Sequence, residues 1–189
     1  MENRLNEIIQ DYKKKNYQDN CIVFCNMQNN LVDTIKYAAI ARDQNDKKHS
    51  HQKRINNDTL NKFAHNLQLK SNEIENVRDF DSLIKIIESN KVNGISSLAI
   101  YDTAHRIGIK LNIIPDKVYI HAGTLKGAKK LLGKKINSKF IDKSEFPTIF
   151  QKQNVTCDEI EDILCIYKDE FDLEKPFSGK FCCNKNNKC

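Results

Sequence analysis

The sequence predicts an all-α protein, a single compact helical domain with helix-hairpin-helix-like units. Apolar residues recur at helical spacing along most of the chain, and alternating strand patterns are scarce, with only CIVF at 21–24 and KVYI at 117–120 as short candidates. Five of the six glycines lie between residues 94 and 133, so the tight turns are expected in that window. At 189 residues the chain is long enough for one sizeable core, and we expect the helical domain to span residues 1–171.

Apolar stripes locate the expected helices in chain order. The stripes are Leu5, Ile8, Ile9 and Tyr12; Leu31, Ile35, Ala38 and Arg42; Leu60, Phe63, Ala64 and Leu67; Leu83, Ile84, Ile86 and Ile87; and Ile160, Ile163, Leu164, Tyr167 and Phe171. Short polar side chains at helix starts accept hydrogen bonds from free backbone amides, so Asp58 or Thr59 is expected to cap the third helix and Asp81 the fourth.

Three segments lack this periodicity. RDQNDKKHSHQKRINND at 42–58 is polar almost throughout, and SKFIDKSEFPTIFQKQNVT at 138–156 contains Pro147, which prevents a continuous helix. Both are expected to be loops. The cysteine-rich segment 172–189 has no repeating apolar pattern and is expected to be a flexible tail.

A glycine-then-helix pattern occurs twice, in VNGISSLAIYDTAHRIG at 92–108 and IHAGTLKGAKKLLG at 120–133. In the first, we expect a hairpin at Gly94, a cap at Ser96 or Ser97, and a helix that buries Ile100, Ala104, Ile107 and Leu111. In the second, Gly123 is expected to make the turn, Thr124 to cap, and Gly133 to end the helix. A hairpin that ends at a helix N-terminus presents free backbone N–H groups to a phosphate oxygen.

The first of these segments resembles the helix-hairpin-helix motif of DNA-binding proteins, whose hairpin usually reads apolar, Gly, apolar, Gly. This chain has Gly94-Ile95-Ser96, so a serine replaces the second glycine. The resemblance implies a helix-hairpin-helix-like core at about 81–133 that contacts the nucleic-acid backbone. The segment 101–108 together with 118–123 also looks like a signature of uncharacterised bacterial proteins, which implies no function.

The resemblance extends distantly to the helix-hairpin-helix DNA glycosylases, in which a catalytic aspartate follows the hairpin after one helix. Ile114-Pro115-Asp116 stands at a similar separation from Gly94, which implies that Asp116 activates water or stabilises an oxocarbenium-like sugar. Ser97-Leu98 stands where the bifunctional members carry a nucleophilic lysine, so an enzyme of this kind would be a monofunctional hydrolase. The alternative is that Pro115-Asp116 only starts a helix.

Two histidines next to glycine turns are candidates for acid–base work, His105 and His121, with a structural role as the alternative for each. Asp102 and Arg106 have the spacing of a helix ion pair, and the alternative is that Arg106 binds phosphate in a cleft. With Asp116, the two histidines complete the predicted catalytic set.

Charge is unevenly distributed in this chain of formal net charge +6. The segment 117–143 is rich in lysine and 158–174 is rich in acids. The basic block at 117–143 could neutralise phosphates. The acidic block at 158–174 could limit the positive field of the basic block or form ion pairs with it. The alternative is that the lysines only form a solvated surface. The predicted nucleic-acid contacts are Gly94, Ser96, Ser97, Gly123, Thr124, Lys126, Lys129, Lys130, His49, His51, Arg54 and Arg106.

Neither a metal nor another cofactor is predicted. In KKHSHQKR, His49 and His51 lie between basic residues and suit a phosphate-contacting arm with Arg54. A zinc site there would need partners such as Cys21 and Cys25, whose spacing is not a usual zinc arrangement. Of the seven cysteines, those at the C-terminus do not have iron–sulfur spacing, and without a secretory signal all are expected to be reduced thiols.

Together these patterns favour a cytoplasmic nucleic-acid-binding protein that contacts the backbone of DNA, or of RNA, through glycine hairpins and a lysine-rich face. The N-terminus lacks the pattern of a signal peptide and no apolar run is long enough for a membrane span, so no membrane partner is expected. The alternatives are a DNA glycosylase-like enzyme that uses Asp116 and a protein-interaction scaffold without catalysis.

Overall fold

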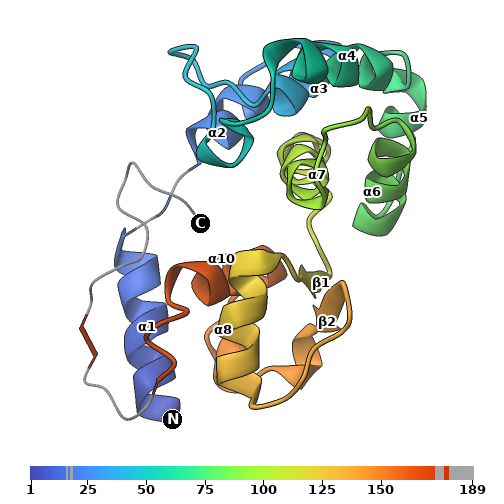
Figure 1. The fold of residues 1–189 in the computed structure, drawn as a ribbon. Helices are drawn as coiled ribbons and strands as arrows, with labels where there is room; N and C mark the ends of the chain where they lie inside the picture. The colour runs from blue at the N-terminus through green and yellow to red at the C-terminus, as the bar shows by residue number, and fades with distance from the viewer. Residues whose placement is uncertain (16, 18, 173–176, 179–189) are drawn as a thin grey trace. The chain divides into compact units, whose positions relative to one another are not determined.

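The chain is all-α, as predicted. The computed structural model describes all residues except 16, 18, 173–176 and 179–189, and the described part contains ten α-helices and one two-stranded sheet (Figure 1). Contacts between Cα atoms group the chain into two compact units. Unit 1 combines Met1–Tyr17 with Asp116–Cys189, and unit 2 is Gln18–Pro115.

Unit 1 is built around α10. Its elements are α1 (Glu2–Lys15), β1 (Lys117–Tyr119), α8 (Ala122–Leu132), β2 (Phe140–Asp142), the 3₁₀ helix η2 (Lys143–Glu145), α9 (Ile149–Lys152) and α10 (Cys157–Ile166). α10 packs against α8, β1 and α1, and the two apolar stripes predicted at 5–12 and 160–171 are both buried in this core. Thr156 and Glu159 form a reciprocal capping box that begins α10.

The small sheet confirms one strand prediction. The first three residues of KVYI form β1, which pairs antiparallel with β2 so that Val118 lies opposite Ile141. β2 lies inside the segment 138–156, which was expected to be a loop. Three residues are too few for an alternating pattern to be visible in the sequence, so only the pairing partner reveals this strand.

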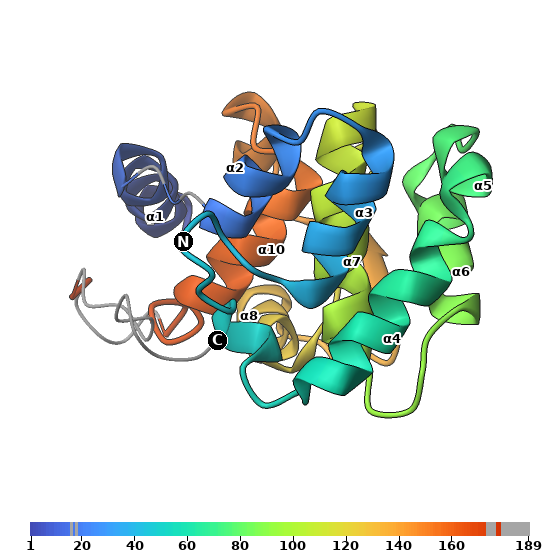
Figure 2. The ribbon, with the colours of Figure 1, turned by 90° about the horizontal axis from the view of Figure 1, so that it is seen from above.

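Unit 2 is a group of helices in which α7 packs against α2, α3 and α6 (Figure 2). Its elements are α2 (Asn20–Asn26), α3 (Leu31–Ile40), the 3₁₀ helix η1 (Ser50–Gln52), α4 (Asn57–Gln68), α5 (Ser71–Glu75), α6 (Phe80–Ser89) and α7 (Ser97–Leu111). The strand predicted for CIVF at 21–24 is wrong, because these residues form α2. Asp19 caps that helix by accepting a hydrogen bond from the Cys21 amide, and Cys21 and Cys25 bury one helical face.

Two caps lie two or three residues before the predicted ones. Asn56, not Asp58 or Thr59, caps α4, and Asp79, not Asp81, caps α6. Each true cap has extended backbone, which lets its side chain turn back to an amide two or three residues later. Neighbouring Asx residues all have suitable side chains, so only the backbone conformation decides among them.

The segment at 42–58 is largely a loop, as predicted, and it contains η1. No helix within the described residues is long and apolar enough to cross a bilayer. The expected tail falls mainly on residues 173–176 and 179–189, which lie outside the described part of the chain, as do Cys182, Cys183 and Cys189.

Candidate functional site

The first glycine segment forms the predicted hairpin between α6 and α7. Gly94 has a φ of +95°, a conformation that side-chain-bearing residues rarely adopt, and the buried Ile95 anchors the turn beside it. Ser96 has extended backbone, and its hydroxyl accepts a hydrogen bond from the Ala99 amide at 3.2 Å. Ser96 is therefore the cap of α7, one of the two residues that the sequence offered.

This hairpin leaves backbone donors at the surface. Within the described part of the chain, the amides of Gly94, Ser97 and Leu98 have no acceptor, and Gly94 and Ser97 are exposed. The N-terminal turn of α4 lies beside the hairpin, since a Cβ at Gly94 would stand 3.5 Å from Cγ2 of Thr59. Arg54, which is also exposed, precedes the α4 cap by two residues.

The second glycine segment does not form a hairpin. Gly123 and Thr124 lie inside the first turn of α8, whose N-terminal boundary residue, His121, makes no capping hydrogen bond with its side chain. The turn predicted at Gly123 and the cap predicted at Thr124 are therefore wrong. The Thr124 hydroxyl donates instead to a Glu161 carboxylate oxygen.

The glycines of α8 have a packing role. A Cβ on Gly123 would lie 2.6 Å from the Cys165 sulfur, and one on Gly127 would lie 2.1 Å from the Leu164 carbonyl oxygen. These glycines let α8 approach α10 closely. The end of α8 is as predicted, because Gly133 adopts a left-handed φ of +63° just after it.

The lysines of α8 are partly neutralised by the acidic segment. Lys126 and Lys130 both bind the Asp169 carboxylate, at 2.9 Å and 3.2 Å. Lys129 is exposed and has no ion pair within the described residues. The sequence left open whether the acidic block limits the positive field of the basic block or pairs with it. These ion pairs favour pairing.

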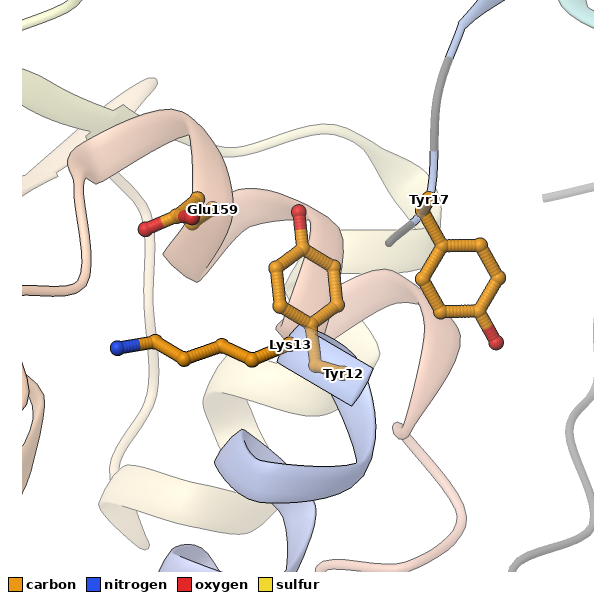
Figure 3. Close-up of a pocket in the computed structure, with 4 residues that line it drawn as sticks. All are labelled: Tyr12, Lys13, Tyr17 and Glu159. Atoms are coloured by element: carbon orange, nitrogen blue, oxygen red, sulfur yellow. The ribbon is translucent and has the colours of Figure 1, made fainter. Parts of the chain in front are cut away.

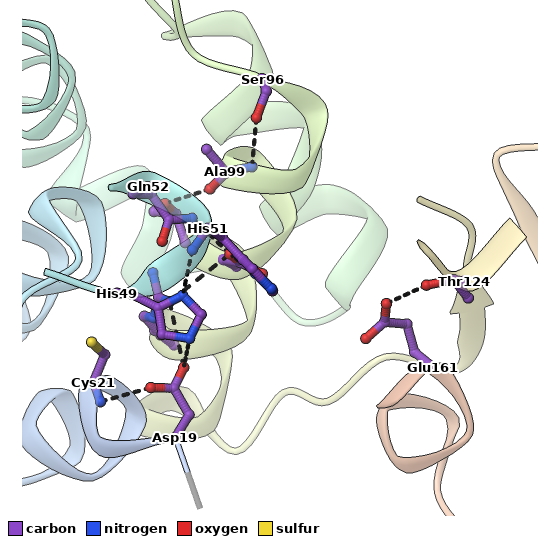
Figure 4. Close-up of polar contacts among 12 residues, drawn as sticks. Asp19, Cys21, His49, His51, Gln52, Ser96, Ala99, Thr124 and Glu161 are labelled. Atoms are coloured by element: carbon purple, nitrogen blue, oxygen red, sulfur yellow. Dashed lines mark hydrogen bonds and ion pairs between the residues drawn. The ribbon is translucent and has the colours of Figure 1, made fainter. Parts of the chain in front are cut away.

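A polar cluster in unit 2 joins the 49–52 segment to α7 (Figure 4). Nδ1 of His51 lies 2.9 Å from Oδ2 of Asp102, and the Gln52 amide nitrogen donates to the same oxygen at 2.6 Å. The His49 ring stands edge-on to the His51 ring, with centroids 4.6 Å apart. We call these four residues, together with Asp19 and Arg106, the histidine cluster.

Arg106 forms the buried base of the histidine cluster. Its guanidinium is 1% exposed, lies 3.4 Å from Asp19 and 3.9 Å from Asp102, and donates to the Ala38 carbonyl oxygen. The predicted ion pair with Asp102 is confirmed. The predicted phosphate contact is corrected, because a side chain this deeply buried presents no surface to a phosphate.

The charges of the cluster shift one another's protonation. Burial would raise the pKa of Asp102, but the hydrogen bond with His51 and the charge of Arg106 outweigh it and hold that pKa well below its usual range. Burial would likewise lower the pKa of His51, and its bond to Asp102 raises it instead. Burial and the charge of Arg106 lower the pKa of His49. The pKa values of two neighbouring histidines are thus shifted in opposite directions by the buried charges around them.

The nearby cysteines behave as apolar residues. Burial raises the pKa of both Cys21 and Cys25 to about 12. Both are therefore protonated thiols near neutral pH, and thiols are poor metal ligands and nucleophiles.

The three predicted catalytic residues are divided between the units. Asp116 is exposed at a bend just before β1, so the helix start offered as an alternative for Pro115-Asp116 is wrong. His121 is half-buried at the start of α8, and His105 stacks on Tyr101 in unit 2 with ring centroids 5.9 Å apart. A catalytic role for these residues stays a prediction.

A pocket of about 280 Å³ in unit 1 contains none of the predicted site residues. Tyr12, Lys13, Tyr17 and Glu159 line it, and the two tyrosine rings stack with centroids 5.7 Å apart (Figure 3). The Tyr12 hydroxyl is already engaged, because it donates to Asp162 at 2.9 Å.

The sequence singled out His49, His51 and Arg106 but not the assembly that they form. No motif in the sequence pointed to Asp19 or Gln52, and Asp102 was predicted only as the ion-pair partner of Arg106. Fifty residues separate Gln52 from Asp102, so only the folding of the loop against α7 brings them together.

Comparisons of the chain with protein-family models, with curated proteins and with solved structures find no match.

Proposed function

We propose that the protein binds the phosphate backbone of a nucleic acid through the hairpin between α6 and α7. One observation carries this proposal: the exposed turn at Gly94 leads into the N-terminus of a 15-residue helix whose first two amides, of Ser97 and Leu98, have no acceptor in the described part of the chain. Such amides, together with the positive end of the helix dipole, suit a phosphate oxygen. The resemblance of this segment to helix-hairpin-helix motifs supports the same function.

Exposed cations in the hairpin and just before α4, whose first turn meets Gly94 at Thr59, complement these amides. Lys53 and Arg54 are exposed just before α4, and Lys91 is exposed in the hairpin, with its amine 3.9 Å from the Glu88 carboxylate. The lysines of α8 contribute less than the sequence suggested, because Asp169 already binds two of them. Contacts of this kind read the backbone rather than the bases, so DNA and RNA are both possible ligands, and binding weakens steeply with salt. A cytoplasmic location is part of this proposal.

The test compares one added charge at the same helical position of the two glycine segments. Ser97 and Ala122 are each the first residue of a helix, each is exposed, and a glutamate is favourable to helix stability at both positions. Ser97→Glu places a negative charge where the phosphate would sit, and Ala122→Glu is the matched control. Fluorescence anisotropy with labelled duplex DNA, single-stranded DNA and duplex RNA at low and high salt measures the affinities.

We expect Ser97→Glu to weaken binding on the order of tenfold or more, because a repelled phosphate contact costs about 1.4 kcal/mol or more. Ala122→Glu should bind like the unmodified protein. Absence of binding to all three ligands at low salt refutes the proposal. Equal losses for the two variants would place the contact away from the α6–α7 hairpin.

Base excision by Asp116 is the enzymatic alternative. It is supported by the exposure of this carboxylate at the bend before β1, where a substrate has access. A panel of duplexes with damaged bases, incubated with the unmodified protein and with Asp116→Asn, tests it. Abasic product from the unmodified protein alone supports the alternative, and equal product from both proteins, or none, refutes it.

A further inference from the structure

We propose that His49, His51 and Asp102 bind a divalent transition-metal ion. Each offers one ligand atom, and the three atoms all lie within 4.8 Å of one another. Two ligands at about 2.0–2.1 Å from one ion lie about 2.9 Å apart at the right angle of an octahedral site and about 3.3 Å apart at the tetrahedral angle. The 2.9 Å between Nδ1 of His51 and Oδ2 of Asp102 lies at the octahedral end of this range. A metal ion would take the place of the proton that these two atoms share.

The two histidines are held in position before any ion arrives. The His49 amide donates to the Ala41 carbonyl oxygen at 2.8 Å, and η1 follows directly. The buried Asp43 carboxylate accepts hydrogen bonds from the amides of Asn45 and Lys47, both at 2.9 Å. The loop therefore carries its own internal bonds, and Asp102 stands on the rigid α7. A ligand set on a fixed backbone needs only small side-chain movements to close around an ion and loses little entropy when it does so.

The charge of the histidine cluster favours a cation. With neutral imidazoles, the two carboxylates of Asp19 and Asp102 face the single guanidinium of Arg106, which leaves one negative charge in excess. Arg106 lies closer to Asp19, at 3.4 Å, than to Asp102, at 3.9 Å. Because a direct hydrogen bond is shorter than 3.9 Å, the arginine does not occupy the ligand oxygen of Asp102.

Gln52 provides an independent observation. This residue is 1% exposed, and its amide nitrogen donates to Asp102. Its amide oxygen is buried and has no hydrogen-bond partner within the described part of the chain. Turning the amide over would only set an oxygen against the carboxylate. A buried acceptor without a donor is costly, and a water molecule on a metal ion with three protein ligands would satisfy it.

The ligand set selects the class of metal. Two imidazole nitrogens and one carboxylate oxygen suit Zn²⁺, Co²⁺, Fe²⁺ or Mn²⁺, whereas Ca²⁺ and Mg²⁺ prefer ligand sets made of oxygen alone. Asp102 supplies the third protein ligand beside the two histidines, so the proposed site needs no cysteine ligand. Three protein ligands leave a coordination position open for water or a ligand.

The first experiment titrates Co²⁺ into the full chain by isothermal calorimetry after treatment with a chelator. Cys182, Cys183 and Cys189 are changed to Ser in every sample so that thiols of the C-terminal segment do not compete. We expect one Co²⁺ per chain. His51→Asn and Asp102→Asn should lower the affinity on the order of 100-fold or more, since loss even of a group that only orients a ligand costs 10–100-fold. His65→Ala removes an exposed histidine of the same unit and is the matched control.

A second measurement keeps the proposal testable if a variant fails to fold. In the nuclear magnetic resonance spectrum of the otherwise unmodified chain, less than one equivalent of Co²⁺ should broaden the ring protons of His49 and His51 and spare those of His65. Loss of signal from His65 first, or an equal loss from every histidine, refutes the site. The absence of both heat and broadening would show that His51 and Asp102 share only a hydrogen bond. Ca²⁺ in place of Co²⁺ should give neither response.

Discussion

Segments 92–108 and 120–133 have the same form in the sequence and different roles in the structure. In the first, Gly94 is needed for its backbone conformation, because its φ of +95° makes an exposed turn. In the second, Gly127 is needed for its missing side chain, because α8 lies against the backbone of α10 at that residue. A glycine in a sequence marks a place where the backbone is special, but it does not say whether a torsion angle or a contact is the reason.

The charged residues of the two segments differ in the same way. Asp102 and Arg106 of the first segment are largely withdrawn from water into the histidine cluster, whereas Lys126 and Lys130 of the second pair with Asp169 at the surface. The buried pair is the longer one, at 3.9 Å against 2.9 Å and 3.2 Å for the surface pairs, so burial rather than length decides what the loss of one partner costs. Loss of one partner leaves an isolated charge where the pair is buried and costs little where water reaches it.

The largest effect is expected from Arg106→Met. It leaves the carboxylates of Asp19 and Asp102 without their countercharge, so the free energy of unfolding should fall by about 3–5 kcal/mol. Urea denaturation followed by circular dichroism measures this loss. Lys126→Met makes the same kind of change in the other segment and should cost less than about 1 kcal/mol. Equal losses from the two variants would contradict the distinction by burial.

Thiol labelling reports which unit a variant opens. Cys21 and Cys25 are buried in unit 2 and Cys157 is buried in unit 1, so iodoacetamide reaches each only after its unit opens. Arg106→Met should expose Cys21 and Cys25 faster than Cys157. Faster modification of Cys157 alone would show that the histidine cluster does not stabilise the unit that contains it.

Gly127→Ala is expected to have the second largest effect. A Cβ at 2.1 Å from the Leu164 carbonyl oxygen forces α8 away from α10, at a cost near the upper end of the 1–3 kcal/mol typical of overpacking, or about 3 kcal/mol. Thermal or urea unfolding gives the value, and Cys157 labelling should accelerate. Gly133→Ala is the control without a clash, since a Cβ there meets no atom within 4 Å, and it should cost only the penalty of its strained φ, about 1–2 kcal/mol.

Gly94→Ala should cost less, about 1–2 kcal/mol, which is the penalty for a side chain in a left-handed conformation. The new Cβ would make only an ordinary contact, 3.5 Å from Thr59. Gly94→Asn should cost less still, because asparagine tolerates positive φ better than alanine does. If alanine and asparagine are equally costly, contact rather than torsion is the constraint at Gly94, and the difference between the two glycine segments disappears.

The sequence predicted those features that depend on neighbours along the chain. The apolar stripes, the hairpin at Gly94, the end of α8 at Gly133 and the strand at KVYI all depend on residues a few positions apart. The features that it missed depend on distant partners. Thr124 was predicted to cap a helix, but its hydroxyl bonds to Glu161, which lies far along the chain. The β2 strand is recognised only by its pairing with β1. The histidine cluster likewise needs a loop and a helix that are far apart in the chain.

Ser96→Ala is expected to cost about 1 kcal/mol, because it removes the hydroxyl that caps α7. Ser97→Ala is the matched control, since Ser97 is the first helical residue and its hydroxyl caps nothing. It should change the free energy of unfolding by less than about 0.5 kcal/mol. Urea denaturation of both variants measures the difference. A greater loss from Ser97→Ala would assign the cap to the other serine that the sequence offered.

The smallest effect is expected where the sequence placed the most charge. Lys126→Ala leaves Lys130 on the same Asp169 carboxylate, so the free energy of unfolding should change by about 0.5 kcal/mol or less, and the change should vanish at high salt. Lys129→Ala, at a neighbouring exposed position without an ion pair in the described part of the chain, is the control and should change nothing. A salt-independent loss from Lys126→Ala as large as that from Arg106→Met would mean that the surface pair is shielded from solvent. Burial would then no longer distinguish the ion pairs of the two segments. The lysines of α8 would stabilise the folded protein, instead of forming an exposed and partly neutralised set of charges.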